Sequence, residues 1–415
     1  KRQLRFSVSL FCCPCVYEEE RILYMKSNKN WKVSAVLFLL SQNISLFGSS
    51  IVGYAVIWHI TLETSSGFWM MMATIFSNLP QIIISLWGGA LADRFNRKYM
   101  IMAADGFIAL ATLGLAISYW AGFQDKILLL VVLAIRSTGA GIQSPAVNAI
   151  YPQIVPKENL TKIQGINQTV NAICLLLAPA IGGVLLGSIG LVWAFMVDVV
   201  TAVIAITIMS MIKVGKQNST VNTNSMISDI RAGIDYVFEH SELKKLIAFY
   251  AIAFILLTPA MVLSPLMIER TFGNEVWRLT ANEILWTVGS LIGGVFIALR
   301  KQIKNKVFAI AAVFIAFGIA FGFMSIATNF ALYLVFILIA GFFMPILTTV
   351  QTVYVQEITE PDVLGRVFSI IQIASTSALP IAILFLGPLA DIVSVQSMLF
   401  VSGVLLVICG VLYGR

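Results

Sequence analysis

The chain has 415 residues, of which 59% are hydrophobic and only 11% charged, with a net charge of +7 and a mean hydropathy of +0.91. Soluble domains carry about 25% charged residues, so this composition excludes an ordinary soluble protein and is typical of an integral membrane protein. A positive net charge can indicate a nucleic-acid partner, but here the basic residues follow the membrane topology, and no nucleic acid is expected.

The first 24 residues precede the first apolar segment and include a CCPC stretch. No small-residue cleavage site follows, so a signal peptide is not expected, and the cysteines lack a second ligand pair for a metal or redox cluster. Glu18–Arg21 would be encoded by purine-rich codons just ahead of Met25, where a bacterial ribosome-binding site would lie. We therefore predict that residues 1–24 are a non-native upstream extension.

Twelve apolar segments follow, each matching the roughly 17 to 25 residues that cross a bilayer core as a helix. Lipid offers the backbone no hydrogen-bond partner, and no segment alternates with the period of a barrel strand. The sequence therefore predicts an all-α membrane protein with twelve transmembrane helices. The expected spans are residues 33–58, 67–91, 99–120, 127–150, 163–188, 191–212, 246–268, 281–299, 307–326, 330–354, 367–389 and 396–413.

The longest polar segment, residues 213–245, divides the spans into six and six. Its GKQNSTVNTNS stretch cannot bury a core, so it is expected to be a cytoplasmic linker. Residues 25–212 and 246–415 would then form an N-terminal and a C-terminal six-helix bundle. Paired bundles of this kind are typical of secondary transporters, whose substrate site lies between the halves near the membrane midplane.

The basic residues predict the orientation of the chain. With the N-terminus in the cytoplasm, the Lys and Arg residues after Met25 fall on the cytoplasmic side except for Arg136, inside a span, and Lys126, Arg270 and Arg278 outside. This asymmetry is the positive-inside pattern, and it places both termini in the cytoplasm.

The turn between the second and third spans carries an unusual concentration of charge. Composition alone allows an ordinary charged surface turn, but the order of residues is more specific. Gly89, Asp93, Arg94, Arg97 and Lys98 follow the pattern Gly-x-x-x-Asp-Arg-x-x-Arg-Lys. This pattern resembles the signature loop of the major facilitator superfamily, which lies at the same place after the second helix.

The charges of this turn predict a gate. A carboxylate at Asp93 can face the positive N-terminal end of the eleventh helix near Arg366, while Arg94 or Arg97 holds acids or carbonyls nearby. Such contacts form and break as the two halves rock, so the turn is expected to close the cytoplasmic side and not to bind substrate. Asn96 replaces the usual glycine, and because Asn tolerates a left-handed backbone, the turn is expected to persist.

Two further elements narrow the resemblance. Pro179, Gly182 and Gly183 belong to an APAIGG element of the fifth span that resembles the Gly-Pro-x-x-Gly-Gly element of drug exporters. A hinge or tight interface is expected there, with ordinary small-residue packing as the alternative. IRSTGAGIQSPAVNAI, VPKENLTK and VQEITEPDVLGRVFSI are most similar to macrolide-efflux (Mef-type) permeases and related tetracycline and siderophore exporters. The resemblance covers the chain after Met25 and implies the major facilitator fold.

Charges within spans are candidates for function, since each costs at least a few kcal/mol at mid-bilayer. At about 1.5 Å per residue, Arg136 lies roughly 14 Å and Asp198 roughly 10 Å below the outer surface, and Asp105 about 9 Å from the inner surface. Depth therefore predicts Asp198 as the partner of Arg136 and assigns Asp105 to the network around the charged turn. One of the acids is expected to bind and release a coupling proton; a static ion pair is the alternative.

The substrate cavity is expected beside the first span, where Asn43, Ser50 and Tyr54 share a helical face with Phe47 and Trp58. Amides, hydroxyls and rings on one face suit an amphipathic drug, although such a stripe can also pack against neighbouring helices. Polar cavity residues are also expected on the fifth and eleventh spans, namely Gln164, Asn167, Asn171 and Gln372.

Together with the resemblance, these features predict proton-coupled export of an amphipathic antibiotic, first of all a macrolide, by a monomer in the bacterial cell membrane. Tetracycline, another drug or a siderophore is the alternative cargo. The remaining alternative is a membrane-embedded enzyme or a channel, yet the chain has two histidines, no phosphate-binding loop motif and no evident selectivity filter. The expected partners are the drug, protons and the lipid bilayer, with no cofactor and no metal.

Overall fold

The computed structural model describes residues 31–212, 214, 234–300, 303–360 and 363–415. The predicted extension and most of the predicted linker lie outside these residues. Within them, twelve helices are long and apolar enough to cross a membrane, which confirms the predicted all-α, twelve-span fold. The helices are α2 (Trp31–Thr64), α3 (Gly67–Arg94), α4 (Arg97–Trp120), α5 (Lys126–Ile154), η1 (Lys157–Asn159), α6 (Leu160–Ser188), α7 (Leu191–Met211), α9 (Ser241–Val262), α10 (Ser264–Phe272), α11 (Val276–Leu299), α12 (Lys306–Ile326), α13 (Phe330–Ile358), α14 (Leu364–Leu389) and α15 (Val395–Gly414).

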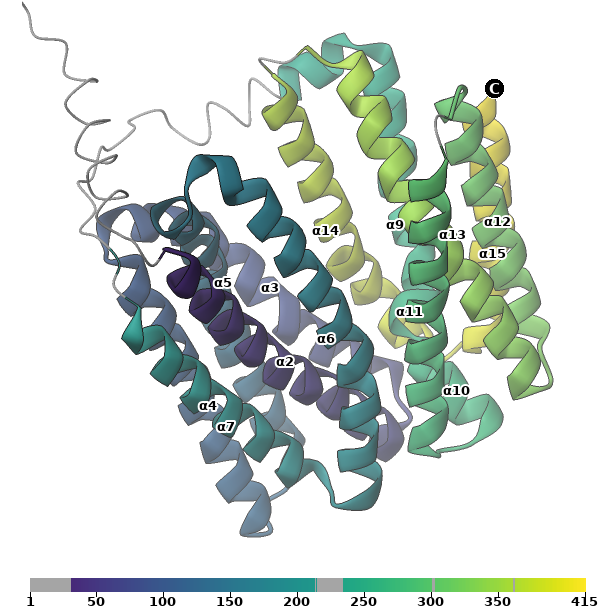
Figure 1. Ribbon diagram of the computed structural model, residues 1–415. Helices are drawn as coiled ribbons and strands as arrows, with labels where there is room; N and C mark the ends of the chain where they lie inside the picture. Colours follow the sequence, from purple (N-terminus) through teal and green to yellow (C-terminus); the bar gives the residue numbers. More distant parts are fainter. Residues whose placement is uncertain (1–30, 213, 215–233, 301–302, 361–362) are drawn as a thin grey trace, which may run out of the picture.

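The helices form two bundles that lie side by side (Figure 1). Helices α2 to α7 make the N-terminal bundle, in which α3 packs on α5 and α7 packs on α2 and α4. Helices α9 to α15 make the C-terminal bundle, in which α12 packs on α15 and α11 on α13. Between the bundles, α3 contacts α14 and α6 contacts α11. The bundles meet at the end where α3 begins, called here the closed end, and diverge toward the end where α6 and α14 begin.

Small residues allow the helices to approach closely. A Cβ atom on Gly48 of α2 would lie 1.9 Å from Thr201 Oγ1 and 3.1 Å from the Cα of Asp198, both on α7. Lipid gives apolar helices little reason to associate, so such packing, together with hydrogen bonds, holds membrane bundles together. Because Gly48 has no side chain, α2 can pack closely against α7, the helix that carries Asp198.

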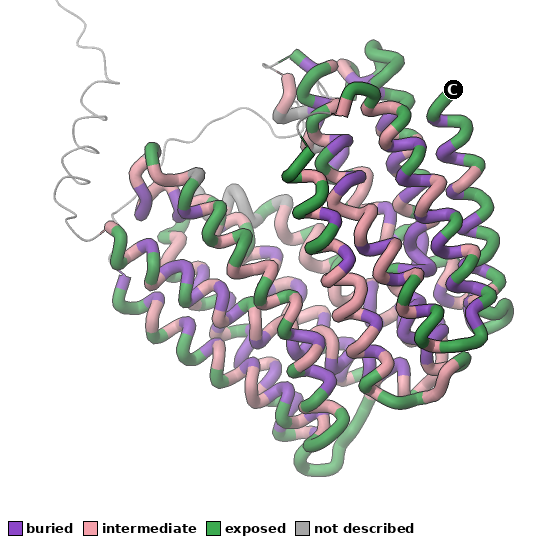
Figure 2. Tube along the Cα trace, turned by 45° about the vertical axis from the view of Figure 1, so that its right-hand side comes forward, coloured by how far each residue is buried: buried purple, intermediate pink, exposed green. Residues whose placement is uncertain are grey.

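Apolar residues also cover the outside of the molecule. Figure 2 shows exposed residues along the full length of the helices, and they include Leu110, Val184 and Phe385, which are 70%, 65% and 73% exposed. Such a surface would be unfavourable in water but matches the hydrocarbon of a bilayer. The exposed side chains are therefore those that a membrane-spanning protein presents to lipid.

The seventh and eighth spans differ from their predicted bounds. The seventh was expected over residues 246–268, but α9 ends at Val262 and a separate short helix, α10, follows. Pro265 lies in the first turn of α10, where its missing amide hydrogen costs nothing. The eighth span begins at Val276 instead of residue 281, so Glu283, which the expected span also contained, lies in the second turn of the helix and not at its start.

Candidate functional site

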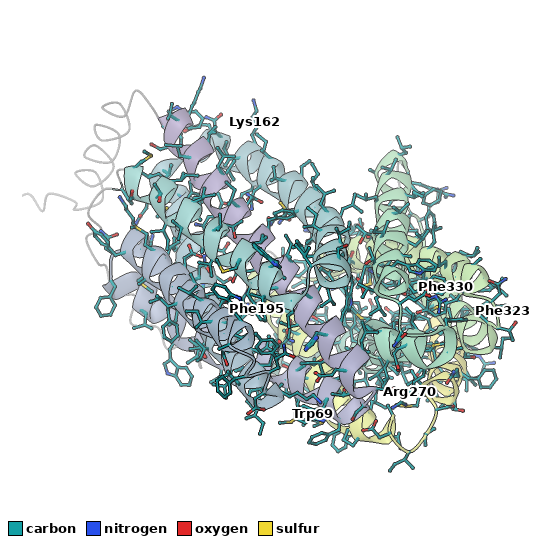
Figure 3. All side chains as sticks on the ribbon, turned by 90° about the horizontal axis from the view of Figure 1, so that it is seen from below. Trp69, Lys162, Phe195, Arg270, Phe323 and Phe330 are labelled. Carbon is teal, nitrogen blue, oxygen red and sulfur yellow. The ribbon has the colours of Figure 1, made fainter. Side chains whose placement is uncertain are left out.

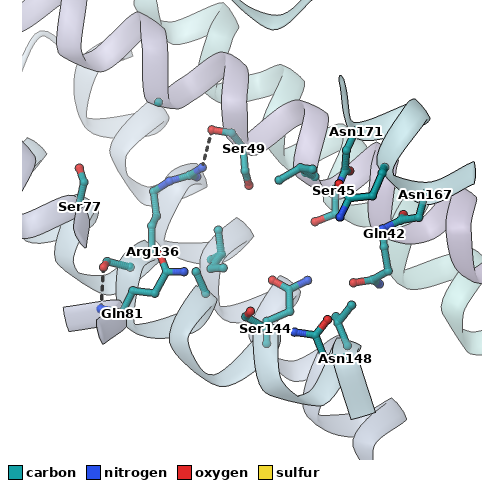
Figure 4. Close-up of a pocket in the computed structure, with 18 of the residues that line it drawn as sticks. Gln42, Ser45, Ser49, Ser77, Gln81, Arg136, Ser144, Asn148, Asn167 and Asn171 are labelled. Atoms are coloured by element: carbon teal, nitrogen blue, oxygen red, sulfur yellow. Dashed lines mark hydrogen bonds between the residues drawn. The ribbon is translucent and has the colours of Figure 1, made fainter. Parts of the chain in front are cut away.

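A cavity of about 490 Å³ lies within the N-terminal bundle (Figure 4). Its lining combines aliphatic side chains with amides and hydroxyls, and Arg136 is the one charged residue among the residues that line it. Drug-binding sites commonly occupy 300–1,000 Å³ and pair an apolar wall with a few placed polar groups. The polar lining residues labelled in Figure 4 are Gln42, Ser45, Ser49, Ser77, Gln81, Arg136, Ser144, Asn148, Asn167 and Asn171.

The structure separates the predicted cavity residues into two groups. Gln164, Asn167 and Asn171 of α6 line this cavity. The first span instead presents a neighbouring face, because a shift of one residue turns a helix by about 100°. None of the predicted residues Asn43, Phe47, Ser50, Tyr54 and Trp58 lines the cavity, nor does Gln372; the lining residues of α2 are Gln42, Ser45, Leu46, Ser49 and Gly53.

Three of the predicted residues that do not line the cavity form hydrogen bonds with nearby groups instead. The Asn43 amide donates to the Leu39 carbonyl at 2.8 Å and to Asn167 Oδ1 at 3.0 Å. Ser50 donates to the Leu46 carbonyl at 2.8 Å, and Gln372 on α14 donates to Thr376 at 3.1 Å. These contacts give the polar groups hydrogen-bond partners within or between helices. They match the alternative interpretation of the stripe, in which it packs against neighbouring helices.

Arg136 of α5 forms a buried ion pair with Asp198 of α7, as depth along the spans predicted. The two side chains are 10% and 2% exposed. Asp198 also accepts hydrogen bonds from Ser49 at 3.0 Å and Thr112 at 3.1 Å. The Arg136 guanidinium reaches the Ser49 carbonyl at 3.5 Å, the contact drawn in Figure 4. Arg136 therefore faces the cavity, and the carboxylate of Asp198 lies behind the residues that line it.

Asp105 of α4 is the second buried acid of this bundle. Its Oδ1 accepts hydrogen bonds from Ser45 at 2.6 Å and Gln143 at 2.9 Å, while Oδ2 has no partner among the described residues. These described contacts join Asp105 to α2 and α5, and eight residues along α4 separate it from Arg97 by roughly 12 Å, so its expected role in the network around the charged turn stays a prediction. Ser45 and Ser49, one turn apart on α2, connect the cavity wall to Asp105 and Asp198.

The charged turn is only partly described. The structure does not describe the surroundings of Gly89 or the side chains of Asp93, Arg94 and Arg366, so the cytoplasmic gate stays a prediction. Lys98 donates to the Ser210 and Ile212 carbonyls at 2.7 Å, which caps the end of α7, and Arg97 donates to the Ala149 carbonyl at 2.7 Å.

Asn96 corrects one expectation about this turn. Its backbone is extended, with φ −67° and ψ 114°, and not left-handed. Its side chain accepts a hydrogen bond of 3.0 Å from the amide of Lys98, so it is the N-cap of α4. An asparagine replaces glycine here because the helix start uses its side chain, not its tolerance of positive φ.

The Pro179 element forms a tight interface without breaking α6, which continues to Ser188. A Cβ atom on Gly182 would lie 3.3 Å from the Ile51 carbonyl oxygen. A Cβ atom on Gly183 would lie 2.0 Å from Thr280 Oγ1 on α11, in the other bundle. These two glycines therefore allow α6 to pack against α2 and across the interface between the bundles.

A second polar cluster joins the two bundles at the closed end, and sequence reasoning missed it. We call it the closed-end latch. Asp391, in the turn before α15, accepts hydrogen bonds from the Gly67 and Phe68 amides at 2.7 and 2.9 Å and from Ser66 at 2.9 Å. Arg270 of α10 pairs with Asp391 at 3.1 Å and donates to the Ser65 carbonyl at 2.6 Å.

In the latch, side chains of the C-terminal bundle form hydrogen bonds with backbone groups of the N-terminal bundle. Figure 3, which views the molecule from this end, shows Arg270 where the C-terminal bundle borders the N-terminal one. Asp391 lies at the N-terminal end of α3, where exposed amides and the helix dipole favour a carboxylate. Ser65 also donates to Glu269 at 2.5 Å and has a left-handed backbone, with φ 46°. The one signal in the sequence was Arg270, a basic residue on the side with few of them.

Asp391 gives the latch a defined pH dependence. Partial burial raises the pKa of its carboxyl, but the hydrogen bonds from the two amides, Ser66 and Arg270 outweigh burial and hold the pKa below its ordinary value. The stabilisation is therefore fully present above the unfolded pKa of about 3.9 and is lost as pH falls through the lower folded value. We expect the distance between spin labels at Phe123 and Ile392, which are 73% and 86% exposed, to stay constant from pH 8 to 5 and to widen below about pH 4. Widening between pH 7 and 6 would contradict this assignment.

Comparison with known proteins places this architecture in a family. Residues 30–415 match the family described as transmembrane secretion effector. Macrolide efflux protein A of Streptococcus pyogenes is 28% identical over 387 residues, covering 92% of this chain and 96% of that protein. Multidrug efflux pump Tap of Mycobacterium tuberculosis is 21% identical over 382 residues, covering 88% and 89%.

Solved structures show the same fold. A bacterial homologue of the iron transporter ferroportin, in an inward-facing state, superposes with a TM-score of 0.72 at 16% identity, covering 92% of this chain and 98% of that one. The nucleoside transporter NupG superposes with a TM-score of 0.68 at 12% identity, covering 92% and 98%. These findings confirm the resemblance noted in the sequence motifs. The chain is a multi-pass transporter and not an enzyme, and it belongs to the transmembrane secretion effector family of the major facilitator superfamily.

Proposed function

We propose that this chain exports an amphipathic antibiotic, with macrolides as the first candidates, across a bacterial cell membrane by alternating access. The observation that carries the proposal is the cavity beside Arg136, whose wall combines aliphatic side chains with amides and hydroxyls. Such a wall can pack the apolar body of a drug and pair with its hydroxyls and carbonyls. The full-length similarity to macrolide efflux protein A supports the antibiotic class.

We assign the closed end to the outer face of the membrane. The basic residues Lys126, Arg270 and Arg278 belong to connections at this end, and most others belong to the opposite side, as the positive-inside pattern requires of a cytoplasmic N-terminus. In this orientation the cavity loads drug from the cytoplasm. Release follows when the latch breaks and the charged turn at Asp93 closes the other end.

We propose that protons drive the cycle through the buried acids. Arg136 compensates Asp198, whereas no described cation pairs with Asp105, so its charge is costly in the apolar bundle and a bound proton would remove that cost. Ser45 and Ser49 connect both acids to the drug cavity through α2. One proton moving down a potential of 100 mV supplies about 2.3 kcal/mol, which corresponds to about a fifty-fold drug gradient.

A broader drug range is the second candidate function. The similarity to multidrug efflux pump Tap favours export of several unrelated drugs, and the polar wall has no charged group besides Arg136 that would select one of them. Tetracycline and siderophores therefore belong in the same test.

The test is transport in a bacterial host that lacks its own drug exporters. Expression is expected to raise the inhibitory concentration of a macrolide at least fourfold and to lower accumulation of the radiolabelled drug. An uncoupler that collapses the proton gradient is expected to restore accumulation to the level of the empty vector. Unchanged susceptibility to macrolides, tetracycline and cationic dyes, with the protein present in the membrane, would overturn the proposal; export that persists with the uncoupler would overturn proton coupling.

A further inference from the structure

Glu283 is a partly buried acid that the N-terminal cavity does not use. It lies in the second turn of α11, inside a membrane-spanning segment of the C-terminal bundle. It lines a separate cavity of about 140 Å³ together with Asn282, Trp286, Met261 and Ile337. One water occupies about 30 Å³ in the liquid, so this cavity has room for a small head group and not for a whole drug.

The carboxylate of Glu283 has no countercharge among the described residues. Its described side-chain hydrogen bond comes from the Asn282 amide, at 3.4 Å. The Asn282 carbonyl oxygen accepts a hydrogen bond from the Tyr333 hydroxyl at 3.0 Å, and this contact turns the amide nitrogen toward Glu283. A carboxylate inside a membrane span costs several kcal/mol unless a cation or proton compensates it. Asp198, by contrast, has Arg136.

Aromatic side chains of both bundles lie near this carboxylate. Trp286 lines the same cavity, and Tyr333 reaches Glu283 through Asn282. Tyr54 and Trp58 of the N-terminal bundle belong to the apolar packing that includes Leu279 of α11. The Tyr54 ring packs on Trp58, with ring centroids 5.6 Å apart. A carboxylate among aromatic rings is the arrangement that binds organic cations, because the ring faces and the acid both attract positive charge.

The site also lies at the interface between the bundles. Thr280, one turn before Glu283 on α11, is the residue that Gly183 of α6 approaches, and Trp58 borders the same contact. Tyr54 and Trp58 belong to α2, whereas Glu283 and Trp286 belong to α11. Any motion that separates the bundles at the closed end therefore removes the rings of α2 from the carboxylate.

We infer that Glu283, beside Trp286 and near the rings of α2 at the interface, binds the ammonium group of an amphipathic organic cation, such as a tertiary or quaternary amine attached to an apolar body. The ammonium enters the small cavity, and the apolar body extends along the interface between the bundles. When the closed end opens, the site loses the rings of α2 and its affinity for the cation falls, which favours release on that side. The consequence for export rests on the proposed function, but binding of the cation does not.

Paired fluorescent probes test the inference directly. Trimethylammonium-diphenylhexatriene carries the cation, and diphenylhexatriene has the same body without it. Binding to the full-length protein in nanodiscs is followed by energy transfer from tryptophan to the probe. The wild type is expected to bind the cationic probe at least tenfold more tightly than the neutral one. Glu283→Gln is expected to weaken the cationic probe at least tenfold and the neutral probe less than twofold, and Glu283→Asp to stay within threefold of wild type.

Glu275→Gln is the matched control, because Glu275 is an exposed acid just before the same helix, and its binding is expected to equal wild type. Equal wild-type affinity for the two probes overturns the inference without any variant. Equal loss of both probes in Glu283→Gln also overturns it, since that outcome indicates a general structural role. If the wild type binds the cationic probe selectively yet exports no drug, the proposed function fails and the cation site stands.

Discussion

Replacing Asp198 by asparagine is expected to abolish drug export while the protein still inserts into the membrane. The change leaves the Arg136 guanidinium buried without its carboxylate, and removing one partner of a buried ion pair costs about 3–5 kcal/mol. The Thr112 hydroxyl and the Ser49 carbonyl would still accept from the guanidinium, but neither can neutralise its charge. Efflux of a radiolabelled macrolide, measured at matched protein levels, is expected to fall at least tenfold.

Two further variants separate coupling from static support. Asp235→Asn changes an exposed aspartate and is expected to leave efflux unchanged. The double variant Arg136→Met with Asp198→Leu replaces the pair by apolar groups of similar volume, which often restores stability. If the pair acts in coupling, the double variant folds but does not transport. Recovery of efflux in the double variant would show that the pair only supports the bundle, and wild-type efflux in Asp198→Asn would remove it from the mechanism.

Replacing Gly67 by alanine is expected to prevent the closed end from sealing. The new Cβ would lie 2.2 Å from the Gly387 carbonyl oxygen and 2.7 Å from the Cβ of Ala390. A backbone oxygen cannot rotate away as a side chain can, so α3 and α14 must move apart. That movement also pulls the Gly67 amide from Asp391 and weakens the latch.

Spin labels at Phe123 and Ile392 measure this separation, and efflux is expected to fall at least tenfold in parallel. Gly114→Ala in α4 is the control, because a Cβ atom there meets nothing within 4 Å. An unchanged label distance in Gly67→Ala would show that the two helices tolerate the extra atom, and the role of this contact in closure would then be abandoned.

The latch and the charged turn suggest how the two ends could alternate. In the described part of the chain, side-chain hydrogen bonds between the bundles gather at Ser65, Ser66, Gly67 and Phe68. The predicted gate at Asp93 belongs to the opposite end of α3. Because α3 is one helix from Gly67 to Arg94, its two ends move together. Breaking the contacts of the latch at one end is therefore expected to accompany the formation of contacts between the bundles at the other end. This coupling stays a prediction for the Asp93 end.

Much of the architecture was determined by the sequence alone. Helix length, apolar composition and the polar linker predicted twelve spans in two sets, because crossing hydrocarbon demands about twenty apolar residues whatever the neighbours are. Depth along the spans also predicted the pair of Arg136 with Asp198, since the cost of a buried charge depends on its distance from the membrane surface. Gln164, Asn167 and Asn171 share one helical face, and that face meets the cavity.

Tertiary structure alone decided the rest. The face of α2 that meets the cavity depends on the rotation of the helix, and a polar aromatic stripe has the same sequence whether it lines a cavity or packs on a neighbour. Glu283 was missed although it falls within the expected span 281–299, and only the structure shows that it lines a cavity without a countercharge among the described residues. The latch joins Gly67 to Asp391, which are 324 residues apart, through backbone amides that every residue type provides. Position along the membrane normal follows from composition, whereas rotation and partners across the bundles follow from packing, and a single sequence does not record them.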